Sequence, residues 1–130
     1  MPYRRITPRD MWVDDPSSPL YNQHFVLKHD PVTPWEFKQQ MKLNDYAHSL
    51  KLFIRHNAAG DQGHPVAGGG SSIFFHIWRR DGQAPTAGCT AMSEENLRAM
   101  IAWLDPSKHP LYVLLPSREY LRLRKAWGLP

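Results

Sequence analysis

Two side chains of this chain have the types that thiol acyl transfer requires: Cys89, the only cysteine, and His76, which precedes it in the chain. A cysteine nucleophile needs a base that withdraws its proton and backbone amides that stabilise the negative charge of a tetrahedral intermediate. His76 lies within an apolar run, so packing would fix its ring. Gly88 allows close approach of the backbone beside Cys89. The pattern therefore predicts a Cys/His acyl-transfer site.

Each residue also has a simpler interpretation. A lone cysteine among small residues is often a buried, unreactive apolar side chain, and a histidine in an apolar strand is often a satisfied core residue. The histidines at positions 56, 64 and 76 lack a recognised metal-ligand spacing, so no metal site is predicted. The glycine-rich run 68–72 lacks the lysine and the following helix of a phosphate-binding loop.

The hydrophobic pattern predicts the elements that position these residues. Residues 50–56 alternate as a half-buried strand, and residues 72–78 are apolar on both faces, as in a central strand. The segment 58–70 between them is a glycine-rich loop. Ser93 has the form of a helix N-cap before an apolar stripe that ends at Asp105-Pro106. Further elements expected are a short helix within 35–46, a short strand at 111–115 and one or two helical turns in the basic tail.

Length and composition limit the classes of protein. The 130 residues are enough for one domain, which we assign to residues 1–130. The net charge of +4 favours an anionic partner without identifying it. No run approaches the roughly 18 apolar residues that cross a bilayer, so no membrane insertion is predicted. The arginines near the N-terminus are not followed by the apolar stretch of a signal peptide.

The order of these features resembles the YkuD-type L,D-transpeptidase domain, whose signature is a histidine followed by a Ser/Thr-His-Gly-Cys element. The matching positions are His76, Thr86, Gly88 and Cys89. A subgroup of similar proteins has short sequence motifs close to those at residues 12–15, 21–22, 56–57, 72–76 and 86–92. The chain departs from the family at Ala87, where a histidine is usual. It also departs after the cysteine, where Thr90, Ala91 and Met92 replace the common Asn or Arg.

The resemblance implies a mainly β domain, similar to a small β-sandwich or barrel, with one or two short helices. It implies that Cys89 attacks the stem peptide of peptidoglycan between residue 3 and D-alanine, with His76 as base and the Gly88 and Cys89 amides as oxyanion donors. No cofactor or metal is expected. Penem-type β-lactams are possible inhibitors, and nucleic acid is not an expected partner. The residues expected to contact substrate are Thr86, Ser72, His56, Asn57 and Thr90.

Three functions remain open at this point. The first is L,D-transpeptidation in cell-wall synthesis, with effects on cell shape. The second is hydrolysis by the same cysteine, as an L,D-carboxypeptidase or an amidase-like enzyme. The third is a non-catalytic, wall-binding remnant of an N-terminally shortened domain. The resemblance places all three in the periplasm or cell envelope. A shortened domain is further expected to expose apolar surface or an unpaired sheet edge.

Overall fold

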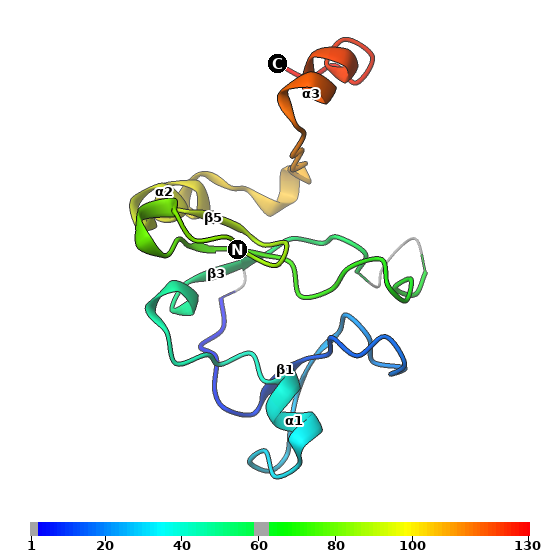
Figure 1. Ribbon diagram of the computed structural model, residues 1–130, viewed down its shortest axis with the longest axis vertical. Coiled ribbons are helices and arrows are strands. Elements are labelled where there is room, and N and C mark those ends of the chain that lie inside the picture. Colours follow the sequence, from blue (N-terminus) through cyan, green and yellow to red (C-terminus); the bar gives the residue numbers. More distant parts are fainter. Residues whose placement is uncertain (1–2, 59–62) are drawn as a thin grey trace.

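The computed structural model describes residues 3–58 and 63–130, which form two small sheets and several short helices (Figure 1). Residues 59–62 of the predicted glycine-rich loop therefore lie outside the described residues. The N-terminal part is an antiparallel ribbon of β1 (Asp10–Trp12) and β2 (His24–Val26). Helix α1 (Pro34–Gln39) packs against this ribbon and confirms the helix predicted within 35–46.

The second sheet has three strands in the order β3-β4-β5. Strand β4 (Phe74–Ile77) lies between β3 (Lys51–Phe53), with which it is antiparallel, and β5 (Thr90–Met92), with which it is parallel. All four residues of β4 are buried, so the predicted central strand is confirmed. The flanking strands are short because turns and loops begin within a residue or two of their ends.

The two faces of this sheet have different surroundings. Phe75 and Ile77 of β4 form a hydrophobic cluster with Leu97 of helix α2 (Glu94–Trp103). Because side chains alternate along a strand, Phe74 and His76 point to the opposite face. The cross-strand pairing of His76 with Lys51 adds Lys51 to that face. The sheet therefore has an apolar core on one side, and on the other a mixed face where His76 and Lys51 lie beside Phe74.

Helix α2 begins as the sequence predicts. The Ser93 side chain accepts a hydrogen bond from the Asn96 amide, and Glu94 and Glu95 occupy the first turn, where acidic side chains interact well with the helix dipole. The described residues also form three short 3-10 helices: η1 (Tyr46–His48), η2 (Arg80–Gly82) and η3 (Pro106–Lys108). No helix among the described residues is both long and apolar enough to cross a membrane.

One expectation about the secondary structure needs correction. Residues 111–115 form no strand: they run without ladder partners, and Leu111 is 93% exposed. The described residues form sheets and short helices, with about 26% of them helical and about 15% in strands. The α-helices among them number three, with α3 (Ser117–Leu123) forming the expected turns of the basic tail. The described strands form an open sheet and a ribbon, without a closed barrel or sandwich.

Leu97 is the side chain of α2 that most directly attaches the helix to the sheet, since it is 0% exposed. We expect Leu97→Ala to lower the free energy of unfolding by about 2–4 kcal/mol, because it leaves a cavity against Phe75 and Ile77. Leu121→Ala removes the same atoms from an exposed site on α3 and should change stability by less than about 0.5 kcal/mol. Urea unfolding measures both; equal losses would contradict this packing.

Candidate active site

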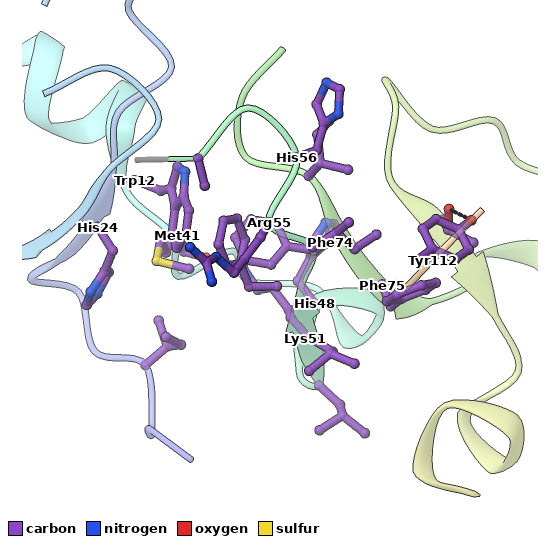
Figure 2. A pocket seen from close by; sticks show the side chains of 18 of the residues that line it. Trp12, His24, Met41, His48, Lys51, Arg55, His56, Phe74, Phe75 and Tyr112 are labelled. Carbon is purple, nitrogen blue, oxygen red and sulfur yellow. Dashed lines mark hydrogen bonds between the residues drawn. The ribbon is translucent and has the colours of Figure 1, made fainter. Parts of the chain in front are cut away.

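The polar face of the three-stranded sheet lines an open groove between the sheet and the N-terminal ribbon. Figure 2 shows that the groove receives side chains from both parts of the chain. Trp12 closes one side by packing on Phe53, with ring centroids 4.2 Å apart. The principal lining residues near the sheet are Trp12, His24, Met41, His48, Lys51, Arg55 and Phe74.

His76 is held in one orientation on this face. It is only 2% exposed, and its Nδ1 lies 2.8 Å from the carbonyl oxygen of Ile77. A carbonyl can only accept a hydrogen bond, so Nδ1 must carry the proton. The other ring nitrogen, Nε2, is then the basic atom. The arrangement has the base and the orienting acceptor that a general-base histidine requires.

A second histidine, His48, supports the ring of His76. The two rings stack with centroids 4.6 Å apart and an angle of 29° between their planes. His48 is held in turn by the carboxylate of Asp45 at 2.7 Å, and Arg79 pairs with the same carboxylate at 2.6 Å. The sequence analysis did not identify this support, because His48 comes from η1, far from His76 in the chain.

Burial is the main cause of a pKa shift at His48. Removal from water lowers the pKa of His48 below its ordinary value, although the hydrogen bond and charge of Asp45 act in the opposite direction. The positive charges that His76 and Lys51 carry when protonated add to the lowering. His48 is therefore stabilised in its neutral form, which suits a ring stacked on another imidazole.

Cys89 lies immediately before β5, as expected from the sequence, and is half-buried. The pairing of His76 with Ala91 sets the register, and Cys89 is two residues before Ala91. By alternation its side chain belongs to the same face as His76, on a diagonal for which Cα atoms are typically about 7–8 Å apart. The sheet thus brings the two predicted catalytic residues to one face.

The thiol does not donate to His76 in this structure. Its hydrogen bond is to the backbone oxygen of Ser72, at 3.6 Å, and none to His76 is found within the described residues. The sequence leads us to expect the two side chains near hydrogen-bonding distance or bridged by one water, and the described residues show no direct bond between them. The physical reason is local, since the carbonyl of Ser72 lies close to the sulfur and competes for its proton.

The turn before Cys89 is shaped by Thr86 and Gly88. The Thr86 hydroxyl donates to the carbonyl oxygen of Cys89 at 2.6 Å and accepts from the amide of Gly88 at 3.3 Å. Gly88 has φ of 139°, and a Cβ there would lie 3.2 Å from Ile73. Any other residue would be strained at this φ. Glycine is therefore required for the chain to enter β5 at this angle.

The sheet pairing separates the two amides that were expected to stabilise an oxyanion. The Trp78 amide donates to the Met92 carbonyl, so Met92 is one of the β5 residues whose backbone groups point toward β4. Alternate residues make such bonds in a parallel pair, so the amide of Cys89 points away from β4. The amide of Gly88 is instead directed at Thr86. Cys89 N–H is thus the better placed of the two donors.

Asn22 connects the N-terminal ribbon to the segment that holds the thiol. Its side-chain oxygen accepts from Trp12 Nε1 at 2.8 Å and from the Ser72 amide at 3.1 Å. Its amide group donates to the carbonyls of His56 and Asn57, at 3.0 and 2.7 Å. All four hydrogen-bonding positions of this buried side chain are filled. The Asn22 clamp, as we call these four bonds, fixes the backbone of Ser72 beside Cys89.

The five residues expected to contact substrate fall into three groups. Ser72 and Thr86 contact Cys89 directly, as described above. His56 and Asn57 hold the glycine-rich loop, through Gly69 at 2.8 Å and through the backbone of Val66 and Gly70. Thr90 is hydrogen-bonded to Tyr112 on the face of the sheet opposite His76. No cluster of metal-ligating side chains occurs in the described part of the chain.

The comparisons with known proteins give one match. The model of the YkuD family, described as the L,D-transpeptidase catalytic domain, matches residues 2–113. That range contains both sheets, helix α2 and every residue of the site described above. No curated protein and no solved structure gives a significant match.

The Asn22 clamp can be tested by removing only its donors. Asn22→Asp keeps the side-chain size and the oxygen that accepts from Trp12 and Ser72, but places a carboxylate against two carbonyls. We expect a loss of about 2–3 kcal/mol in the free energy of unfolding, measured by urea titration. Asn44→Ala, at an exposed asparagine, is the control and should be nearly neutral. A neutral Asn22→Asp would show that the clamp does not stabilise the fold.

The environment of His48 predicts a pH dependence of stability. Because the folded-state pKa of His48 is lowered, the unfolded chain binds this proton more readily, and stability is lost as pH falls below about 6.5. His48→Gln removes that proton uptake. The variant should lose less stability than the wild type between about pH 7 and 5 in urea titrations. An unchanged pH profile would contradict the assignment.

Proposed function

The chain belongs to the YkuD family of L,D-transpeptidase catalytic domains, and we propose that it is a cysteine acyltransferase acting on the stem peptides of peptidoglycan. Cys89 is the nucleophile and His76 the general base. The observation that carries the proposal is the His76 ring on the face that Cys89 shares: its Nδ1 bonds to the Ile77 carbonyl, and no described residue hydrogen-bonds to its Nε2. The family match supports the same reaction class.

The first half-reaction forms a thioester. The thiol exchanges its hydrogen bond to Ser72 for one to Nε2 of His76, a change that rotation of the short Cys89 side chain can make. His76 takes the proton, and the sulfur attacks the carbonyl between the third residue and D-alanine. The amide of Cys89 donates to the oxyanion. The carbon–nitrogen bond then breaks, and D-alanine leaves with the proton from His76.

The second half-reaction returns the enzyme to its starting state. A side-chain amine of a second stem attacks the thioester carbonyl while Nε2 of His76 accepts the amine proton. The carbon–sulfur bond breaks, the new amide is released, and Cys89 recovers its proton from His76. Water in place of the amine gives the hydrolase, with a free tripeptide as product. A penem carbonyl can acylate the same sulfur.

The surrounding residues have supporting roles in this proposal. His48 keeps the His76 ring in place through the stack, and Thr86 and Gly88 set the direction in which the chain carries Cys89. Ser72 holds the thiol until substrate arrives. A peptidoglycan substrate places the protein at the cell envelope. His56, Asn57 and Thr90 line the same cavity, so a donor that fills it would reach them.

Product analysis with purified tetrapeptide muropeptides tests the reaction. We expect cross-linked dimer and free D-alanine from the wild type, and neither from Cys89→Ala. His76→Gln should lower the rate about 10²–10⁴-fold, because the general base is lost. Cys89→Ser should be nearly inactive, since a hydroxyl needs a stronger base. Mass spectrometry identifies the products.

The same experiment separates the alternatives. Tripeptide without dimer would assign the chain to hydrolysis. Intact substrate, together with a Cys89 that iodoacetamide labels only after unfolding, would contradict the enzyme proposal and favour a non-catalytic wall-binding domain. Labelling of the folded wild type, lost in Cys89→Ala, is the positive control.

A further inference from the structure

Lys51 brings a positive charge to the groove face beside the candidate catalytic pair. It is the direct cross-strand partner of His76, so the two side chains leave the sheet on the same side. Its ammonium lies 5.7 Å from the centre of the Phe74 ring. Phe75 pairs with Thr90, so the residues before them in the two strands, Phe74 and Cys89, lie opposite each other if the register continues. Figure 2 shows Lys51 among the side chains that line the groove.

The ammonium of Lys51 is only partly satisfied by the protein. It donates to the Met41 carbonyl at 2.5 Å, and it has no carboxylate partner within 4.0 Å among the described residues. An ammonium has three donors, so further hydrogen-bonding capacity remains. Burial lowers the pKa of Lys51, and negative charge on Asp45 and Cys89 opposes that shift.

The rest of the groove does not supply the missing negative charge. Asp45 is the one acidic side chain among the described lining residues, and its carboxylate is already paired with Arg79 and His48. Arg55 continues the alternation of Lys51 and Phe53 and adds a second cation to the same face. Gly88 and Thr90, on either side of Cys89 in the chain, line the same groove, and its charge balance favours an anionic ligand near that segment.

We propose that Lys51 binds a carboxylate of the acyl donor and so acts as a specificity residue for the acyl transfer proposed above, on which this inference rests. A carboxylate beside Lys51 would compensate the partial burial of the ammonium, for which the described residues supply no counter-ion. The same contact would hold the donor carbonyl over Cys89. The carboxylate belongs either to the side chain of the third stem residue or to the terminal D-alanine.

A pair of alkylating reagents tests the charge beside Cys89 without any substrate. Iodoacetate and iodoacetamide attack the same thiolate, so the ratio of their rates does not depend on how much thiolate is present. That ratio reports the local electrostatic potential. We expect Lys51→Met to lower the iodoacetate-to-iodoacetamide ratio about three- to tenfold at low salt. Lys51→Arg, which keeps the charge, should stay within about twofold of the wild type.

Two controls separate this effect from a structural one. Lys28→Met removes the same unit of charge from an exposed position and should leave the ratio unchanged. Lys51→Gln keeps a donor for the Met41 carbonyl and should lower the ratio as Lys51→Met does. In the wild type, added sodium chloride should lower the ratio toward that of Lys51→Met, a readout that needs no variant.

The outcomes distinguish this inference from the proposed function. If Cys89 reacts in the folded wild type and the iodoacetate-to-iodoacetamide ratio is the same there as in Lys51→Met and Lys51→Gln, the role of Lys51 is overturned. The proposed acyl transfer is then unaffected. A Cys89 that neither reagent labels in the folded protein would overturn both, because a donor site needs an accessible thiol.

Amidated donors identify which carboxylate is bound. Lys51→Met should raise KM for the tetrapeptide donor while kcat changes little. Amidation of the recognised carboxylate, on the third residue or on D-alanine, should raise the wild-type KM similarly and abolish the effect of Lys51→Met. Equal KM values for wild type and Lys51→Met with all donors would overturn the inference.

Discussion

The alternation of side chains along β4 is the constraint on which the rest of the structure depends. Phe75 and Ile77 must face α2 for the core to form, and this choice sends Phe74 and His76 to the opposite face of the sheet. A slip of one residue would expose the apolar pair and bury the histidine against the helix. The same register fixes Lys51 next to His76 and brings Cys89 to their face. Core packing and the geometry of the candidate site are therefore set together.

A second set of contacts joins the parts that this sheet does not hold. Asn22 connects the N-terminal ribbon to the backbone of Ser72, and the carbonyl of Ser72 accepts a hydrogen bond from the thiol. His48 reaches His76 from η1 and is itself held by Asp45. Each of the two candidate catalytic side chains thus has a support from a distant segment. Lys51, by contrast, has no carboxylate partner among the described residues, which is why we assign it to substrate rather than to stability.

The features that local patterns encode could be predicted from the sequence. The central strand, the Ser93 cap and the alternation around β3 all follow from neighbouring residues. The Asn22 clamp, the stacked histidines and the Ser72 hydrogen bond could not be predicted, since each joins segments far apart in the chain. Residues 111–115 were wrongly predicted as a strand, because an apolar run does not reveal whether a partner strand is available. The polar face of the predicted strand at 50–56 did contain Lys51, but its proximity to Cys89 depends on the sheet order.

The most direct test of the central claim is to trap the acyl-enzyme. The protein is incubated briefly with tetrapeptide donor in the absence of an amine acceptor, quenched in acid, and examined by intact-mass and peptide-mapping mass spectrometry. The account predicts one added tripeptide acyl group per chain, carried by the peptide that contains Cys89, with one D-alanine released for each. The adduct should be missing in Cys89→Ala. D-alanine release that persists in Cys89→Ala, or an acyl group on another residue, would contradict it.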